Sequence, residues 1–419
     1  MKEVDYQLNQ VLPINAKNTA LIRGFAKGTP GVPTYNPGHV FDPILLMEIV
    51  KWHMDMEGLR DALFLTGATG CGKTSSLRQF CAALNLPYYE DTADEIKGTD
   101  QWIGANKIVK GEFQWFDGPL TSVYRHGGVF VINEVDLMGP GMATGLNNAL
   151  EREPLYIPEL GGQPITPHPM MRIAMTGNTA GAGDQTGLYL GTNRMNAAFM
   201  DRAMVVEVDY LKPEQEEKVL ELRVPSLPEE IRKKMVKVAA DIRRAFKDTS
   251  NSLEVGMSTR TLIRWAGLAI RYQGVTALGH NPIAFALKRA LTNRALPESA
   301  LAIESIAYET FGSDMDDPDM QHLFGRQSSS LGNQNAGNGE LIREVYLRQR
   351  GSGINANGFK LWHGFAYENA LVIEYGKQGN SLTRRSVPKA ECENEQPDSE
   401  LTLRFERKRA DGYEYYQTN

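Results

Sequence analysis

The sequence is poor in the features of secreted, disulfide-bonded or membrane-spanning proteins. It has three cysteines in 419 residues, Cys71, Cys81 and Cys392, too few and too scattered for a disulfide framework or a four-cysteine zinc site. No apolar run approaches the length of a transmembrane helix. The start, MKEVDYQLNQ, lacks the pattern of a signal peptide. We therefore expect a soluble, cytoplasmic protein that does not contact membranes.

An excess of positive charge is also missing. The formal net charge is −6 and the sequence pI is about 5.8, so the chain as a whole offers no general attraction to nucleic acid or to an anionic membrane. A local basic patch is not excluded by these totals. The hydrophobic content of 42% is ordinary for a soluble protein, and the length suffices for two or three domains.

The most informative stretch is residues 60–76, RDALFLTGATGCGKTSS. Residues 61–66 predict a short buried strand, and residues 75–84 have the apolar spacing of a helix. Between them the chain matches G-x-x-x-x-G-K-[ST] at each fixed position. The matching residues, with the next one along the chain, are Gly67, Ala68, Thr69, Gly70, Cys71, Gly72, Lys73, Thr74 and Ser75.

This motif supplies the chemistry of a nucleotide phosphate site. Its glycines let consecutive backbone N–H groups turn toward an anion, and the helix that follows points its positive dipole end at the same place. Lys73 is expected to contact the β- and γ-phosphates, and the Thr74 hydroxyl to bind Mg²⁺. The sequence therefore predicts a site for ATP and Mg²⁺.

A second nucleotide element follows the apolar residues 127–132, which end in Asn133-Glu134-Val-Asp136. P-loop ATPases commonly place two carboxylates here, one acting on Mg²⁺ and the next on the attacking water. Glu134 occupies the position of the water-activating carboxylate. Asn133 occupies the metal-side position, where a neutral amide can hold a Mg²⁺-bound water but adds no charge. We expect weaker metal affinity unless Asp136 compensates.

Two further residues are candidates for contact with the phosphates. Residues 171–178 predict another buried strand with Asn178 at its C-terminal end, where ligands of open α/β sheets gather. Asn178 is a candidate contact for the γ-phosphate or the lytic water. Residues 258–262 have the pattern of a capped helix start, with Arg260 in the first turn. Because the helix dipole disfavours a cation there, Arg260 is expected to have an anionic partner; the alternative is a solvent-exposed arginine.

The expected fold class is α/β, a doubly wound P-loop sheet, because strands alternate with helices after the motif. We expect five parts: an N-terminal arm (1–38), the α/β nucleotide-binding domain (39–211), an α-helical lid (212–312), a polar linker (313–358) and a small β-rich domain (359–419). The last is expected to contain strands at 359–362, 370–375 and 401–407. Hairpins are expected at 110–119 and 154–169.

Four stretches, taken in order, resemble MoxR-type AAA+ ATPases, and most closely the cobaltochelatase ATPase subunits (CobS-like). They are GATGCGKT at 67–74, KGEF…DGPL at 110–120, PHPM…TGN at 167–178 and GDQTGLY…GT…MDR at 183–202. The similarity covers roughly residues 30–290. The last stretch is the most specific, because AAA+ proteins in general do not share it.

The resemblance implies a homo-oligomeric ring, usually a hexamer, with ATP at each subunit interface. Arg202 matches the arginine finger that reaches the neighbour's γ-phosphate, and Arg194 is the alternative. Asn178 matches sensor 1, and Arg260 matches sensor 2 on the lid. The two hairpins match inserts that line or flank the pore. Such ATPases commonly work with a partner bearing a von Willebrand A domain and remodel a client, often to insert a metal or cofactor.

The C-terminal part lies outside this pattern. Its turn at residues 375–379 is similar to a WGR domain, a module of nucleic-acid-linked proteins. Basic and aromatic residues there are candidates for a binding face, or form a solvated mixed-charge surface: Arg384, Arg385, Lys408, Arg409, Tyr413 and Tyr415.

Three functions follow. The favoured one is a ring-forming ATPase that remodels a partner protein. The alternatives are a nucleic-acid-associated motor that reads DNA or RNA with its C-terminal domain, and an ATP-binding scaffold with little turnover, which Asn133 suggests.

Overall fold

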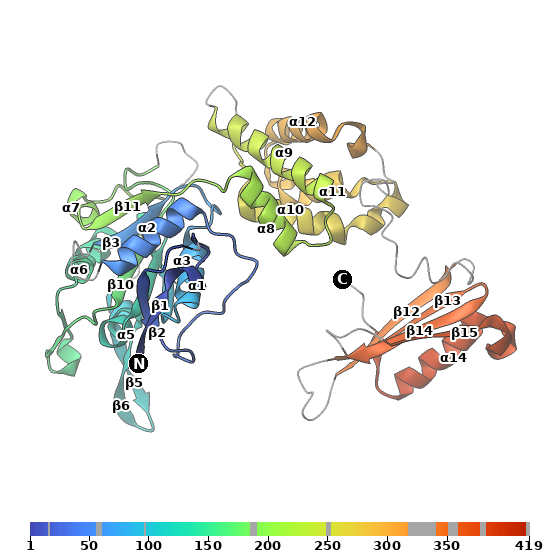
Figure 1. The fold of residues 1–419 in the computed structure, drawn as a ribbon, viewed down its shortest axis with the longest axis horizontal. Helices are drawn as coiled ribbons and strands as arrows, with labels where there is room; N and C mark the ends of the chain where they lie inside the picture. Colours follow the sequence, from blue (N-terminus) through green and yellow to red (C-terminus); the bar gives the residue numbers. More distant parts are fainter. Residues whose placement is uncertain are drawn as a thin grey trace. The chain divides into compact units, whose positions relative to one another are not determined.

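The computed structural model describes residues 1–15, 17–55, 61–95, 98–184, 191–248, 253–316, 341–350, 359–377 and 383–415. The chain divides into two compact units, residues 1–320 and 321–419, which are described separately (Figure 1). Residues 185–190 of the stretch GDQTGLY…GT…MDR lie outside the described residues. Of the helices within the described ranges, none combines the length and apolar character needed to cross a bilayer.

A five-stranded parallel sheet forms the centre of the first unit. Its three central strands are buried because helices cover both faces of the sheet, whereas the two edge strands are partly exposed. The strand order differs from the chain order, as in doubly wound folds, and confirms the predicted α/β class. In order across the sheet the strands are β11 (Ala203–Glu207), β3 (Ala62–Thr66), β10 (Met171–Thr176), β7 (Gly128–Asn133) and β4 (Tyr88–Thr92).

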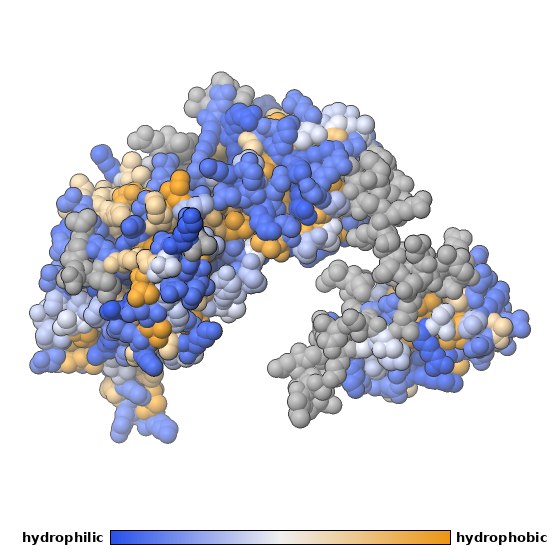
Figure 2. Space-filling model, in the orientation of Figure 1, coloured by the Kyte–Doolittle hydropathy of each residue, from blue (hydrophilic) through white to orange (hydrophobic). Residues whose placement is uncertain are grey.

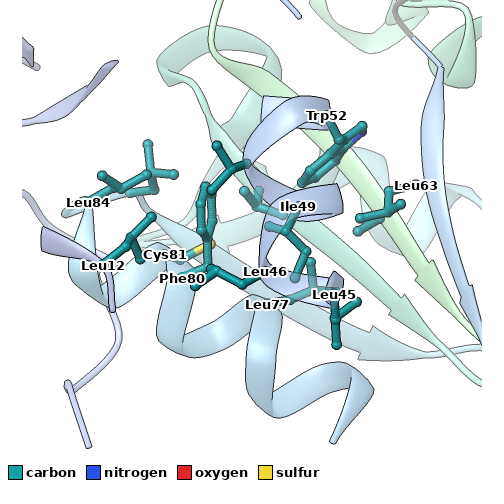
Figure 3. Packing of buried hydrophobic residues seen from close by; sticks show 14 of the residues in the cluster. Leu12, Leu45, Leu46, Ile49, Trp52, Leu63, Leu77, Phe80, Cys81 and Leu84 are labelled. Carbon is teal, nitrogen blue, oxygen red and sulfur yellow. The ribbon is translucent and has the colours of Figure 1, made fainter. Parts of the chain in front are cut away.

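Helices α2 (Pro43–Met54) and α3 (Lys73–Ala83) pack on one face of this sheet. Figure 3 shows Leu46 and Ile49 of α2 against Phe80 and Cys81 of α3. Helices α5 (Pro119–His126) and α6 (Pro140–Leu150) contribute to the core on the other face. The short helices α4 (Asp100–Ile103) and α7 (Ala197–Met200) connect strands.

The N-terminal arm packs into the hydrophobic core that α2 and α3 form on one face of the sheet. Strands β1 (Glu3–Gln7) and β2 (Leu21–Phe25) form an antiparallel hairpin around the short helix α1 (Leu8–Val11). Ile22 and Phe25 are buried in the cluster that contains α2 and α3. The Phe25 N–H donates to the carbonyl oxygen of Leu84 at the end of α3, 3.1 Å away. Apolar side chains thus anchor the N-terminal arm to the nucleotide-binding domain.

Both expected hairpins are present, although the first begins at Gly104, before the predicted range of 110–119. One joins β5 (Gly104–Val109) to β6 (Glu112–Asp117), and the shorter one joins β8 (Leu155–Tyr156) to β9 (Pro164–Ile165). The β5–β6 hairpin extends from the domain and carries apolar side chains on its surface (Figures 1 and 2). Ile108 is 69% exposed and Phe113 is 79% exposed, far more than side chains of this kind need to be in a core.

The predicted helical lid follows β11. It consists of α8 (Pro213–Arg223), α9 (Glu229–Lys247), α10 (Thr259–Arg271), α11 (Pro282–Ala290) and α12 (Pro297–Phe311). Ser258 caps α10 as expected, because its side chain accepts a hydrogen bond from the Thr261 N–H. The start of α10 is therefore set by the sequence Ser-Thr-Arg-Thr, with Arg260 in its first turn.

The second unit is an antiparallel sheet of five strands with one helix. The strand order is β15 (Thr383–Pro388), β14 (Ala370–Lys377), β13 (Phe359–Tyr367), β12 (Leu341–Arg350) and β16 (Glu414–Tyr415). Strand β12 lies within the stretch expected to be a linker; residues 317–340 and 351–358 of that stretch lie outside the described residues. Val345 and Leu347 of β12 are buried, which accounts for its pairing with β13.

The strand predicted at 401–407 is wrong, because these residues belong to helix α14 (Pro397–Ala410). The alternation in LTLRFER resembles a half-buried strand. However, Pro397 stands at a helix start, acidic residues occupy the first turn and basic residues the last, which suits the helix dipole. Leu401 is buried against the sheet in this helix.

Replacing Phe80 by alanine is expected to lower the free energy of unfolding by about 3–5 kcal/mol, because a fully buried ring is lost and a cavity remains. Phe113→Ala, at the exposed hairpin tip, is the matched control and should stay within about 0.5 kcal/mol of the parent. Urea denaturation measures both. Equal effects of the two changes would contradict this description of the core.

The stability of the first unit should fall in mild acid because of His53. This side chain is buried against Phe80, and its Nε2 lies 2.8 Å from the carbonyl oxygen of Arg23. Burial lowers the pKa of His53 to about 4, with Arg172 acting in the same direction. Between pH 6.5 and 4 the unfolded chain therefore binds a proton that the folded chain excludes.

This difference in proton binding by His53 should lower the free energy of unfolding by about 3 kcal/mol as the pH falls from 6.5 to 4. His53→Gln should be less stable at neutral pH but should show a smaller loss between pH 6.5 and 4. The control, His126→Gln at an exposed position of α5, should keep the parent's dependence. Urea midpoints measured at several pH values give the comparison. If the midpoint changes with pH equally in His53→Gln and in the parent, the role of His53 is contradicted.

Candidate functional site

The P-loop joins β3 to α3 at the C-terminal edge of the parallel sheet. Two of its glycines are required by close approach. A Cβ at Gly67 would lie 2.2 Å from the Val208 carbonyl oxygen, and one at Gly70, where φ is +75°, would lie 2.9 Å from Ser258 Oγ. Gly72 precedes α3 without a side-chain cap, so the first backbone N–H groups of the helix are available to an anion.

Lys73 lies within this loop. Its Nζ donates to the carbonyl oxygens of Gly67 and Ala68, at 2.5 and 3.0 Å, and lies 3.5 Å from Asn178 Oδ1. Burial lowers the pKa of Lys73 below its ordinary value, although Cys71 and Asp136 act in the opposite direction. The ammonium group is thus held inside the loop that the sequence motif assigns to phosphate binding.

Thr74 and Asn133 come together as the sequence predicted. The Thr74 hydroxyl donates to Asn133 Oδ1 at 2.8 Å, and the Thr176 hydroxyl donates to the same oxygen at 3.1 Å. Hydroxyl and amide oxygens are hard donors of the kind that Mg²⁺ accepts, together with phosphate and water. Among the described residues, no group of three or more His, Cys, Asp or Glu side chains is placed to hold a metal. The donor set therefore fits Mg²⁺ bound chiefly through nucleotide phosphates.

Glu134 follows β7 in a backbone conformation that is rare for its residue type. Its φ is +54° and its ψ is +44°, before the single turn at Val135–Leu137. Non-glycine residues in this region carry strain, and such residues cluster at functional sites. The side chain is exposed and lines the same pocket as Lys73. A carboxylate that solvent reaches beside a phosphate site can act on water.

Asn178 faces the P-loop from the end of β10. Its Oδ1 accepts a hydrogen bond from the Thr69 hydroxyl at 3.2 Å. Asp136 fixes the backbone at this position, because its Oδ2 accepts hydrogen bonds from the N–H groups of Asn178 and Thr179 at 2.8 and 3.0 Å. Asp136 is fully buried. The structure therefore directs this carboxylate at the 178–179 backbone, whereas the sequence left open whether Asp136 compensates for the missing charge of Asn133 at the metal.

Lys73, Thr74, Asn133, Glu134 and Asn178 line one pocket of about 640 Å³, a volume in the range of small-molecule sites. The P-loop, the ends of β7 and β10 and the lid all contribute to its walls. Arg260, exposed in the first turn of α10, lines it from the lid. Thus the structure brings together Lys73, Thr74, Asn133, Glu134, Asn178 and Arg260.

The two candidate finger residues lie elsewhere. Arg202 follows α7, where its Nε is 2.8 Å from Glu151 Oε1 and one Nη donates to the carbonyl oxygen of Ala198. Arg194 is exposed, and its backbone forms a bridge to Ala182. Neither arginine lines the pocket of its own chain.

The segment before α2 contributes residues that the sequence did not identify. His39 lines the pocket and packs edge-on against Phe41, with ring centroids 4.5 Å apart. Burial lowers its pKa to about 4, and Arg223 of α8 acts in the same direction. His39 is therefore neutral at pH 7. Its buried Nε2 makes no hydrogen bond within the described residues.

Comparisons with known proteins agree with this geometry. Residues 62–203 match the AAA domain of the dynein-related subfamily, and residues 216–309 match the CbbQ/NirQ/NorQ C-terminal family. Aerobic cobaltochelatase subunit CobS of Sinorhizobium sp is 30% identical over 254 residues, covering 58% of this chain and 75% of CobS. Denitrification regulatory protein NirQ of Pseudomonas aeruginosa is 27% identical over 202 residues, covering 48% and 73%.

A longer relative also matches. Mouse von Willebrand factor A domain-containing protein 8 is 25% identical over 315 residues, which are 66% of this chain but 15% of that protein. Taken with the P-loop and the strand ends around it, the CobS and NirQ similarities show that the chain belongs to the MoxR-type AAA+ ATPases, close to CobS, and that it hydrolyses ATP.

Proposed function

We propose that the chain works as a ring, usually of six copies, in which each ATP site is completed by the neighbouring subunit. The observation that carries this proposal is the position of Arg202. The pocket holds Lys73, Glu134 and Asn178 but neither candidate arginine finger. An arginine supplied by a neighbour is worth about a thousandfold or more in related phosphoryl transfers, so hydrolysis depends on assembly.

Within each site the residues take distinct roles. The P-loop N–H groups from Gly67 to Ser75 cradle the phosphates, and Lys73 and Arg260 oppose their charge. Glu134 polarises the attacking water, and Asn178 orients that water or the γ-phosphate. Thr74 and Asn133 hold Mg²⁺, which neutralises charge on the phosphate oxygens when it is bound. Arg202 of the adjacent subunit stabilises the charge on the transferred phosphoryl group.

The work performed is remodelling of a partner protein in the cytoplasm. Two relatives carry names that point this way, a cobaltochelatase subunit and a protein with a von Willebrand A domain. We propose a partner with such a domain and a role in inserting a metal or cofactor. The apolar tip of the β5–β6 hairpin, with Ile108 and Phe113 exposed, suits contact with a client protein.

The experiment that tests this proposal measures steady-state phosphate release against protein concentration while particle size is followed by light scattering. Turnover per subunit should rise cooperatively over the range in which rings form. Constant turnover per subunit in monomeric protein would overturn the shared site. ATP binding without multiple turnovers at any concentration would favour the scaffold alternative, or a partner that must complete the site.

A further inference from the structure

The connector between β11 and α8 contacts both the P-loop and the lid. It contains Tyr210, whose hydroxyl donates to the carbonyl oxygen of Thr69 at 3.3 Å. On its other side, the guanidinium carbon of Arg243 lies 4.1 Å from the centre of the Tyr210 ring, within the range of a cation–π contact. One side chain therefore joins the phosphate-binding loop to helix α9.

Arg243 belongs to a buried network that ties three lid helices together. Two of its guanidinium nitrogens donate to the two carboxylate oxygens of Glu216 on α8, at 2.7 and 2.8 Å, and Nε donates to the Met257 carbonyl oxygen at 2.6 Å. The Thr259 hydroxyl, at the start of α10, donates to Glu216 Oε1 at 2.6 Å. This bidentate geometry fixes position and direction as well as charge.

The network ends beside Arg260. Thr259 is its neighbour in sequence, and Ser258, the residue before, caps α10 and approaches Gly70 of the P-loop. The start of α10 is consequently held against the P-loop at two places: directly at Ser258 and Gly70, and through Tyr210, Arg243 and Glu216. Because an interaction that fixes α10 also fixes where Arg260 enters the pocket, the second route bears on phosphate binding.

We propose that Tyr210 is a positioning residue that links the P-loop to the Glu216–Arg243 pair and so holds Arg260 toward the γ-phosphate. The inference rests on the proposed role of Arg260. It predicts that Tyr210 matters for distinguishing ATP from ADP, since only ATP presents a γ-phosphate to Arg260. If the network served only to stabilise the lid, Tyr210 would affect both nucleotides equally.

The test uses the full chain and two ligands, ADP and β,γ-imido-ATP, each with Mg²⁺. Tyr210→Leu removes the cation–π contact and the hydrogen bond, and should reduce the preference for β,γ-imido-ATP over ADP by about fivefold to tenfold. Tyr210→Phe, which loses only the hydroxyl, should cause a smaller reduction. Tyr308→Phe is the matched control: Tyr308 is an exposed residue of α12 whose hydroxyl donates to Asp316, and its loss should leave the preference unchanged.

A double-mutant comparison with Arg260→Ala separates positioning from stability. If Tyr210 acts through Arg260, adding Tyr210→Leu to Arg260→Ala should change the preference little further. Additive effects would overturn the inference about Tyr210 but not the proposed role of Arg260. The same holds if Arg260→Ala reduces the preference and Tyr210→Leu leaves it unchanged. An unchanged preference in Arg260→Ala itself would overturn the proposed role of Arg260 and this inference with it. Thermal unfolding of each variant shows whether the lid is folded.

Discussion

Replacing Glu134 by glutamine is expected to lower the turnover number for ATP about a hundredfold or more while ATP binding stays close to that of the parent. Glutamine has nearly the same shape as glutamate, but its amide cannot polarise a water molecule as a carboxylate does. Lys73, Thr74 and the P-loop N–H groups, which carry the expected phosphate contacts, are untouched by this change. Binding and turnover should therefore separate.

Phosphate release and equilibrium nucleotide binding on the same protein give the two quantities. Glu207→Gln is the matched control, because Glu207 is an exposed carboxylate at the end of β11 that does not line the pocket. It should keep the parent's turnover. Equal turnover in Glu134→Gln and the parent would remove Glu134 from the reaction.

This variant also tests whether the strained backbone at Glu134 has a function. A left-handed conformation costs a non-glycine residue of order 1–3 kcal/mol, which the surrounding structure must offset. Here β7 ends at Asn133, and the next turn buries Val135 and Asp136. These buried neighbours turn the chain so that Glu134 projects into the pocket. Glutamine should retain that geometry, so a defect in turnover would reflect chemistry.

The sequence was informative where a short segment determines its own geometry. The P-loop combines a strand, glycines and a helix within residues 61–84, so the relation of Lys73 and Thr74 to the helix start follows from local structure. Asn133 and Asn178 were each expected at the C-terminal end of a buried strand, the end where ligands of open α/β sheets gather. The 2.8 Å contact between Thr74 and Asn133 shows that this reasoning extends to a pair 59 residues apart.

It was less informative where position depends on packing between distant segments. His39 lies in an irregular loop and lines the pocket together with Arg223 of the distant helix α8. Asp136 was identified as a carboxylate near the site, but its partner is the backbone of residues 178–179, which no spacing reveals. The Glu216–Arg243 pair joins two helices whose charged residues resemble any solvated surface.

The C-terminal unit shows how two local signals compete. Residues 401–407 alternate like a strand, yet the helix start at Pro397 and the dipole-compatible charges prevail. Strand β12 was missed because its many charged residues follow a polar, glycine-rich stretch. Burial of Val345 and Leu347 identifies it as a strand with one face in the core, a property that depends on its partner β13.

Replacing Arg202 by alanine should abolish ATP hydrolysis with ATP affinity nearly unchanged, a loss of about a thousandfold in turnover. The reason is geometric: Arg202 does not line the pocket of its own chain, where it pairs with Glu151. Its side chain therefore contributes little to nucleotide binding within one subunit. Arg194→Ala, measured in parallel, tests the alternative finger and should retain activity if Arg202 is the one used.

Mixing the two inactive variants distinguishes a shared site from a self-contained one. In a ring with head-to-tail interfaces, an Arg202→Ala subunit keeps an intact Glu134, and an adjacent Glu134→Gln subunit can supply Arg202 to it. Random equimolar mixing makes about a quarter of the interfaces complete in this way. Activity should consequently return in the mixture, although each variant alone is inactive.

No such recovery is possible if Arg202 acts on the pocket of its own chain, because neither variant then has both groups. The mixture must first be dissociated and reassembled, and particle size must show that mixed rings have formed. Mixing Arg202→Ala with a double variant, Glu134→Gln with Arg202→Ala, is the control and should remain inactive. Recovery in the first mixture and not in the second would place the arginine of one subunit in the catalytic site of the next.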